Sequence, residues 1–396
     1  MKISVNIYKL LLILILLFVP INLLKDLFPI PLTLITGGII LILMIAILLT
    51  RLKKKQFILM ILPIAIFALN FAFTDNISRH VRYFLNWYAL LCTLLMCSDS
   101  DILKKFCNAY YKSERSIHRL TQLVALIFVV LLIMPAAYSG GWWGLSNGFT
   151  AFTVSHAVAA SACGFLVYEL IYLQNHQRKL PMLEGMLYVL LSVYVVFQTG
   201  ARTYVISIAA IALIYLFDII KSRKIRISII VIGLIFVTVI FSKSAFIEKM
   251  AITESYQTVN NVSFLNAITS GRTLIWTVDF LSYIHSGLYT LFFGKGFAFS
   301  YEINRLKYFG LDIFSHNIFL ETLLSEGFIG LAILLNLMIK MIKKFKIDKI
   351  SLVASMMYVP LIGFLNGLFD SQIYCYSILI LGIAFYNKIN ICSRYN

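Results

Sequence analysis

Long apolar runs alternate with short polar segments along almost the whole chain. A helix needs about 20 apolar residues to cross the hydrocarbon core of a bilayer, and about twelve runs approach that length. Because the runs are continuous and do not alternate in polarity, they predict transmembrane helices and not the strands of a barrel. The predicted spans cover residues 8–24, 30–50, 57–73, 83–98, 119–137, 155–173, 181–198, 203–220, 227–242, 317–339, 351–369 and 372–387.

Composition agrees with this pattern. The chain is 61% hydrophobic and only 13% charged, and its mean hydropathy is +0.90. Too little polar surface is present to cover a soluble domain of this size. We therefore expect an all-α integral membrane protein in which residues 1–396 form one polytopic domain. No small-residue cleavage site follows the first apolar run, which predicts a retained first helix.

The lysines and arginines are distributed unevenly between the two sets of loops. About 24 of the 34 fall in alternate loops that share one side with both termini, and about ten fall on the other side. The positive-inside rule then predicts that both termini are cytoplasmic. The net charge of +17 follows from topology and from contact with anionic lipids, so no nucleic-acid partner is needed to explain it.

Two segments are predicted to face outward. One is the Gly- and Trp-containing loop 138–154, and the other is the large extracytoplasmic loop 243–315. Loops as long as the second are usually functional or disordered. Its apolar and aromatic clusters, such as Leu291-Phe292-Phe293, predict an ordered and partly helical segment.

Several kinds of chemistry have no support in the sequence. The six cysteines lie in or beside apolar runs or on the cytoplasmic side, so no disulfide framework is indicated. No spacing of His, Cys or acidic residues is typical of a metal site, and no glycine-rich phosphate motif occurs. We expect no metal and no cofactor. The candidates that remain are polar residues at the outward ends of helices.

Two arginines are candidates for binding an anion. Arg202 stands directly before the run 203–220, whose helix is predicted to start outside, where the free N–H groups favour anions. Arg272 follows Ser270-Gly271, a turn or cap before an amphipathic helix. The guanidinium group can bind a phosphate through two hydrogen bonds. The alternatives are an interfacial arginine reaching to lipid headgroups at 202 and a surface arginine at 272.

His316 is the candidate base. With Ser315 as the N-cap, His316 falls in the first turn of the helix over 317–339, where the helix dipole disfavours its cation and lowers its pKa. A neutral imidazole is what a general base requires. The alternative is a structural histidine that only donates or accepts a hydrogen bond.

The rest of this helix adds two expectations. His316, Leu320, Leu323, Gly327 and Gly330 share one helical face, which would let a neighbouring helix approach closely. Glu326 lies about a quarter turn from that face and deeper in the helix, and its burial requires a polar partner or a water-filled cavity.

The string His316-Asn317-x-x-Leu320-x-x-Leu323-x-x-Glu326-Gly327-x-x-Gly330 resembles the signature of the O-antigen polymerase and O-antigen ligase superfamily. Arg202 before a helix, and Ser270-Gly271-Arg272 in the preceding large loop, are similar to the two functional arginines of that family. The Gly-Phe element at 148–149, ahead of an outward-starting helix with His156, extends the resemblance.

The resemblance implies a metal-independent glycan transferase with a GT-C-like fold in the bacterial inner or plasma membrane. Its donor and acceptor would be polyprenyl-diphosphate-linked oligosaccharides, and its active site would be extracytoplasmic. Arg202 and Arg272 would bind the diphosphate and His316 would accept a proton, with Asn317, Glu326 and His156 in support. Membrane lipids, a chain-length regulator and a flippase would be its partners.

Two activities occur within the superfamily. A polymerase joins lipid-linked repeat units into O-antigen or capsule, and a ligase transfers finished glycan to a lipid A core or a protein. The stretch His-Asn-Ile-Phe-Leu-Glu-Thr-Leu at 316–323 resembles polymerases more closely. A transporter or flippase is the alternative of a different class, but few ionisable residues interrupt the spans within 8–73 and 203–242.

The charge asymmetry predicts the result of a topology experiment. Reporter fusions after Lys55, Lys224 and Lys346 should give cytoplasmic signals, and a fusion near Lys295 should give an external one. An external signal at Lys346 would reverse the orientation and, with it, the side on which the candidate residues lie.

Overall fold

The fold is described from a computed structural model. The described residues are 6–51, 54–112, 114–139, 148–175, 179–219, 222–224, 227–228, 231, 266, 269, 271–307, 310, 312–346, 349–367, 378–379 and 382–383. Almost all of the regular structure is helical. The one sheet found among these residues consists of two antiparallel strands of two residues each, in which Tyr138 pairs with Phe149.

The helices follow the apolar runs closely. In the first half of the chain they are α1 (Ile7–Leu23), α2 (Leu32–Leu49), α3 (Lys54–Asn70), α4 (Ile77–Ser98), α5 (Ser100–Tyr111), α6 (Glu114–Ile133), α7 (Ser155–Asn175), α8 (Lys179–Gln198) and α9 (Arg202–Ile219). After β1 (Tyr138–Ser139) and β2 (Gly148–Phe149), which precede α7, the later elements are α13 (Arg272–Ile284), α14 (Leu288–Phe293), α15 (Phe299–Lys307), α16 (Ile318–Phe345), α17 (Lys349–Met356) and α18 (Ile362–Asn366).

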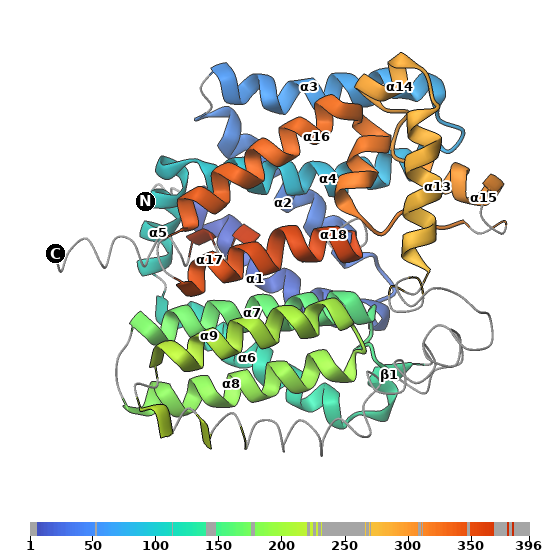
Figure 1. The fold of residues 1–396 in the computed structure, drawn as a ribbon. Helices are drawn as coiled ribbons and strands as arrows, with labels where there is room; N and C mark the ends of the chain where they lie inside the picture. The colour runs from blue at the N-terminus through green and yellow to red at the C-terminus, as the bar shows by residue number, and fades with distance from the viewer. Residues whose placement is uncertain are drawn as a thin grey trace, which may run out of the picture.

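The long helices lie side by side, and the polar elements gather at one end of them. In Figure 1 the long helices run across the view, whereas α13 crosses their ends at the right. The hairpin of β1 and β2 lies at the same end, as do α14 and α15. The segments that sequence analysis predicted to face outward therefore share one end of the helical layer. Which side of the membrane this end faces stays a prediction.

The predicted spans and the helices agree in position. Ten of the predicted runs coincide with helical segments of the structure, whereas most of 227–242 and most of 372–387 lie outside the described residues. Four helical segments are long and apolar enough to cross a membrane by length and composition: Leu32–Leu49, Gln56–Phe73, Ile77–Ser98 and Ile318–Phe345. The other apolar helices are shorter, so the count of about twelve spans is not confirmed. The short amphipathic helix α5 was not predicted.

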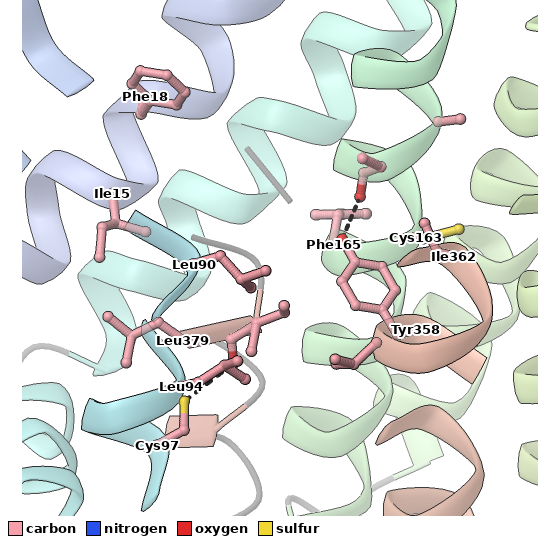
Figure 2. Close-up of a cluster of buried hydrophobic side chains, with 14 of the residues drawn as sticks. Ile15, Phe18, Leu90, Leu94, Cys97, Cys163, Phe165, Tyr358, Ile362 and Leu379 are labelled. Carbon is pink, nitrogen blue, oxygen red and sulfur yellow. Dashed lines mark hydrogen bonds between the residues drawn. The ribbon is translucent and has the colours of Figure 1, made fainter. Parts of the chain in front are cut away.

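Small residues allow the helices to approach closely in the core. In α7 the side chains of Ala159, Ala160 and Cys163 are fully buried. Tyr358, in the π-helical turn Met357–Leu361 between α17 and α18, packs against this part of α7 and donates its hydroxyl proton to the carbonyl of Ala160 at 3.0 Å (Figure 2). Association of helices in lipid depends on such close packing and on interhelical hydrogen bonds, because lipid tails are as apolar as the side chains.

Helix α16 is interrupted in its middle. Gly327 has φ 67° and ψ −166°, values outside the helical region. The chain segment after α14 lies directly against this break, where the amides of Lys295 and Gly296 donate to the carbonyls of Leu324 and Ser325 at 2.8 and 3.1 Å. These bonds satisfy carbonyls that the broken helix leaves without intrahelical partners, as burial requires.

Asn70, at the end of α3, completes this junction. Its amide donates to the carbonyls of Phe293 and Ser325 at 3.0 and 2.9 Å, and its side-chain oxygen accepts from the Tyr289 hydroxyl at 3.3 Å. The prediction of one continuous helical face through Gly327 is therefore wrong. The close approach that the glycine allows is made by the end of the short helix α14, through the backbone of Phe292 and Phe293.

The predicted loop 243–315 contains three helices among its described residues, α13, α14 and α15, and residues 243–265 lie outside the described ones. Whether this segment forms a loop outside the membrane stays a prediction. The position of α14 was not foreseen, because it packs beside α16 near Gly327, about 14 Å along the helix from Ile318. Part of this segment thus lies against a membrane helix.

Gly327→Ala should destabilise the protein by about 2–4 kcal/mol, because the added Cβ meets the backbone of Phe292 and Phe293 and φ is positive. Gly38→Ala is the matched control, since a Cβ there has no atom within 4 Å and alanine favours the helix. Thermal unfolding of both purified variants measures the difference. Equal midpoints for the two would contradict this description of the junction.

Candidate active site

Arg272 is fixed against the end of another helix. It is the first residue of α13, and Gly271 before it has a φ of 84°, as predicted for a turn that starts a helix. Its Nη1 donates to the carbonyl of Leu365 and, at 3.0 Å, to Oδ1 of Asn366. Both acceptors belong to the last turn of α18, where the helix dipole favours a cation.

Arg202 brings a second positive charge to the same place. It is the first residue of α9 and follows a tight turn in which Gly200 has a φ of 65°. Burial, with a contribution from the charge of Arg202, lowers the pKa of Arg272 to about 10. Two cations this close repel each other, so an anion that bridges them would be stabilised.

Helix α9 and helix α18 are also joined directly. The hydroxyl of Thr203 donates to Oδ1 of Asn366 at 3.4 Å. This amide oxygen thus accepts from both α9 and α13, and Asn366 connects the two arginine-bearing helices. Sequence analysis missed Asn366. The signal available was its place before Gly367, since glycine commonly follows the end of a helix.

His316 lies just outside α16. The N-cap is Asn317, whose Oδ1 accepts from the amides of Phe319 and Leu320 at 3.0 and 3.2 Å. The prediction that Ser315 caps the helix, with His316 in its first turn, is wrong. Asparagine caps a helix as well as serine does, and the hydroxyl of Ser315 is bonded elsewhere, to Asp279. His316 itself has a φ of 53°, which non-glycine residues seldom adopt.

The surroundings of His316 keep its imidazole neutral. Burial, followed by the charges of Arg272 and His156, holds the pKa of His316 well below its usual value, against an opposing hydrogen bond with the backbone of Asn366. Sequence analysis predicted the direction of this shift but attributed it to the helix dipole. The ring packs on Phe314 with centroids 3.9 Å apart.

His156 joins the cluster from α7. It is the second residue of that helix, and its ring centroid lies 6.4 Å from that of Tyr204 in α9. Its charge also acts on His316. Four of the six predicted site residues, from α7, α9, α13 and the segment before α16, therefore meet at one end of the bundle.

Asn317 and Glu326 have other positions. Asn317 serves as the helix cap. Glu326 is fully buried beside the break in α16, close to Gly330, and neither carboxylate oxygen has a hydrogen-bond partner among the described residues. It belongs to the junction with α14 and not to the cluster around His316. Among the residues that the structure describes, no group of three or more His, Cys, Asp or Glu side chains could hold a metal ion.

The comparison with known families agrees with this geometry. Residues 187–335, from α8 into α16, match the O-antigen ligase family. The resemblance to the O-antigen polymerase and ligase superfamily is thereby confirmed, and the matched segment contains Arg202, Arg272 and His316. Among curated proteins, none matches the chain.

The family match extends the conclusions to function at a general level. It supports a membrane transferase of glycans that acts on lipid-linked sugars in polysaccharide biosynthesis. His156 and Asn366 lie outside the matched residues, so their part in the cluster is known from the structure alone.

Arg202→Lys and Arg272→Lys should each lower the rate of glycan transfer by about 100-fold, the usual cost of losing one donor to a developing negative charge. Lysine keeps the charge but cannot form the two-pronged bond to a phosphate. The matched control is Arg305→Lys, at an exposed position in α15. Rates are measured with equal amounts of purified protein. Normal rates in both variants would contradict a part for these arginines in transfer.

Proposed function

We propose that the protein is a membrane glycan polymerase that joins polyprenyl-diphosphate-linked oligosaccharide repeat units into a surface polysaccharide, O-antigen or capsule. The observation that carries the proposal is the meeting of Arg202, Arg272 and a neutral His316 at one end of the bundle, from segments distant in the sequence. The family match over the same residues supports it.

In this proposal the arginines bind and stabilise the leaving group. The bond between the anomeric carbon of the donor sugar and its diphosphate breaks, and the lipid diphosphate leaves with the electron pair. Arg272 is held through Nη1, which leaves its other guanidinium edge to bind phosphate oxygens. Arg202 binds from the opposite helix. Cations fixed before the reaction stabilise the developing charge without reorganising.

His316 activates the nucleophile in this proposal. The acceptor sugar hydroxyl attacks the anomeric carbon, and His316 takes the hydroxyl proton as the new glycosidic bond forms. Its lowered pKa keeps it in the form that can accept a proton. The diphosphate, once bound between the arginines, would favour the protonated imidazole that the reaction creates, because opposite charges then lie close together.

A ligase is the second candidate, since the matched family carries that description. The two activities share the donor, the leaving group and the base, and differ in the acceptor: another lipid-linked repeat unit for a polymerase, a lipid A core or a protein for a ligase. We favour the polymerase because the stretch 316–323 resembles that group more closely. The site is proposed to be open to the extracytoplasmic side of the bacterial inner membrane.

Cells that express only the His316→Ala protein test the proposal. Loss of a general base lowers the rate by about 10²–10⁴-fold, so a polymerase variant should leave glycan of a single repeat unit while protein level and donor binding stay normal. Accumulation of long lipid-linked polymer would identify a ligase instead. Near-normal polymer would exclude His316 as the base. Transfer by the wild-type protein should also survive chelators, and loss with EDTA that a divalent cation restores would contradict the arginine mechanism.

A further inference from the structure

Ser315, the residue before His316, is held through every polar group that it has. Its N–H donates to Oε1 of Glu321 at 2.5 Å, and its hydroxyl donates to Oδ2 of Asp279 at 2.5 Å. Its carbonyl accepts from the indole N–H of Trp276 at 2.6 Å. Ser315 is fully buried.

The two carboxylates that hold Ser315 are themselves fully engaged. The second oxygen of Asp279 accepts from the amide of Asn304 at 3.1 Å, and the second oxygen of Glu321 accepts from the hydroxyl of Ser300 at 3.0 Å. Both acids are buried, at 0% and 1% exposure. Buried acidic groups are costly unless every oxygen is satisfied, and here all four oxygens accept a hydrogen bond. Such an arrangement is a specific structure and not a by-product of packing.

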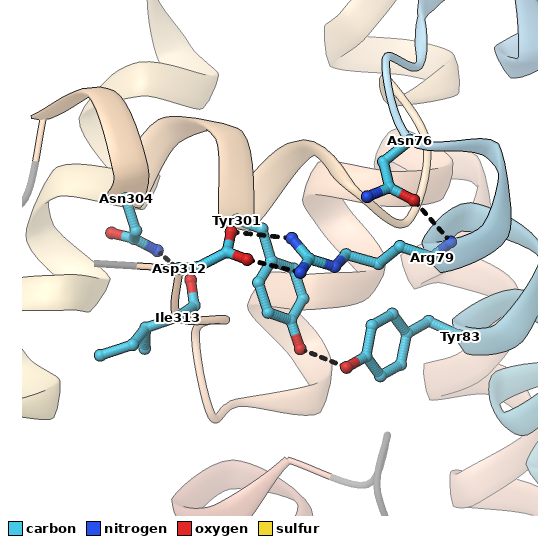
Figure 3. Close-up of polar contacts among 7 residues, drawn as sticks. All are labelled: Asn76, Arg79, Tyr83, Tyr301, Asn304, Asp312 and Ile313. Atoms are coloured by element: carbon cyan, nitrogen blue, oxygen red, sulfur yellow. Dashed lines mark hydrogen bonds and ion pairs between the residues drawn. The ribbon is translucent and has the colours of Figure 1, made fainter. Parts of the chain in front are cut away.

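The residues ahead of Ser315 are anchored as well. Asn304 also donates to the carbonyl of Ile313 at 3.0 Å. Asp312 forms a two-pronged ion pair with Arg79 of α4, and the Arg79 guanidinium lies 4.1 Å from the ring centroid of Tyr301 (Figure 3). The segment 312–315 is thus fixed to α4, α13, α15 and α16 before the chain reaches His316.

This restraint explains how His316 keeps an unfavourable backbone conformation, with a positive φ. A histidine in the left-handed region is disfavoured and persists only where its surroundings hold it. Gly367 packs against the backbone of His316, since a Cβ added at Gly367 would lie 3.1 Å from the carbonyl carbon of His316. Loss of the bonds to Ser315 would remove this restraint on the backbone of His316.

One face of α13 connects the arginine at the end of α18 to the segment that carries His316. Arg272, Trp276 and Asp279 follow each other at helical spacing and all point inward, the first to the end of α18 and the others to Ser315. We propose that Trp276, Asp279 and Glu321 are positioning residues that hold His316 at its working place through Ser315. The inference rests on the proposed role of His316 as the base.

Variants at Glu321 and Ser315 test this proposal. Glu321→Ala and Ser315→Ala each remove one bond of the restraint. Glu321→Gln preserves it, because the amide oxygen still accepts from the Ser315 N–H and the amide nitrogen can donate to the Ser300 hydroxyl. Thr277→Val, on the exposed side of α13, is the matched control. The measurements are kcat for transfer and Kd for polyprenyl diphosphate, on purified protein that unfolds cooperatively.

The proposal expects kcat to fall by about 100-fold in Glu321→Ala and Ser315→Ala, the scale of a base displaced by about 1 Å. Kd should stay within about threefold, because the arginines remain, and Glu321→Gln and the control should keep near-normal kcat. A network that only stabilises the fold would change the unfolding temperature and leave kcat per folded molecule unchanged, which would overturn the inference. Equal losses in Glu321→Gln and Glu321→Ala would also overturn it.

The same series separates this inference from the proposed function. If Ser315→Ala keeps its kcat while His316→Ala is inactive, the inference about the positioning residues is wrong and the assignment of His316 as the base stands. If His316→Ala keeps its activity, the base assignment fails, and this inference fails with it.

Discussion

The bonds from Arg272 to the end of α18 connect α13, in the segment predicted to face outward, to a helix of a predicted membrane span. A guanidinium that is largely enclosed by protein is stable only where acceptors surround it. The carbonyl of Leu365 and the amide oxygen of Asn366 provide them at the negative end of a helix that runs from Lys349. Because α13 starts at Arg272, this contact sets the position of the whole helix, and with it the position of Ser315 and His316.

Restraint of the backbone recurs at several points in the molecule. Gly327 breaks α16 so that the segment after α14 can supply amides to its free carbonyls. Gly271 and Gly200 start the two helices that carry the arginines. At His316 a residue other than glycine takes a similar conformation, and three side chains from two helices, α13 and α16, hold the residue before it. Burial makes such restraint necessary, since each unpaired backbone group buried away from water would be costly.

The local part of this arrangement could be predicted from the sequence. Apolar runs located the helices, and the turn before Arg272 and the start of α9 at Arg202 followed from short-range rules. The N-cap could not be chosen correctly between Ser315 and Asn317, because the partner that occupies the Ser315 hydroxyl is Asp279, far upstream in the chain. Asn366 was missed for the same reason: its partners, Thr203 and Arg272, come from other helices. Contacts between distant segments of the chain determine these positions, and the periodicity of apolar residues along the sequence carries no information about such contacts.

The central claim is that His316 stays neutral beside the fixed cation of Arg272 until it accepts a proton. Nitrogen NMR of ¹⁵N-histidine-labelled protein in lipid bilayers reads the protonation state directly, with the His316 signal assigned by its loss in His316→Gln. Because burial and the charges of Arg272 and His156 lower the pKa of His316, the account predicts that the imidazole is neutral at neutral pH and gains a proton only well below 6.5. A titration midpoint at or above 6.5 would contradict it.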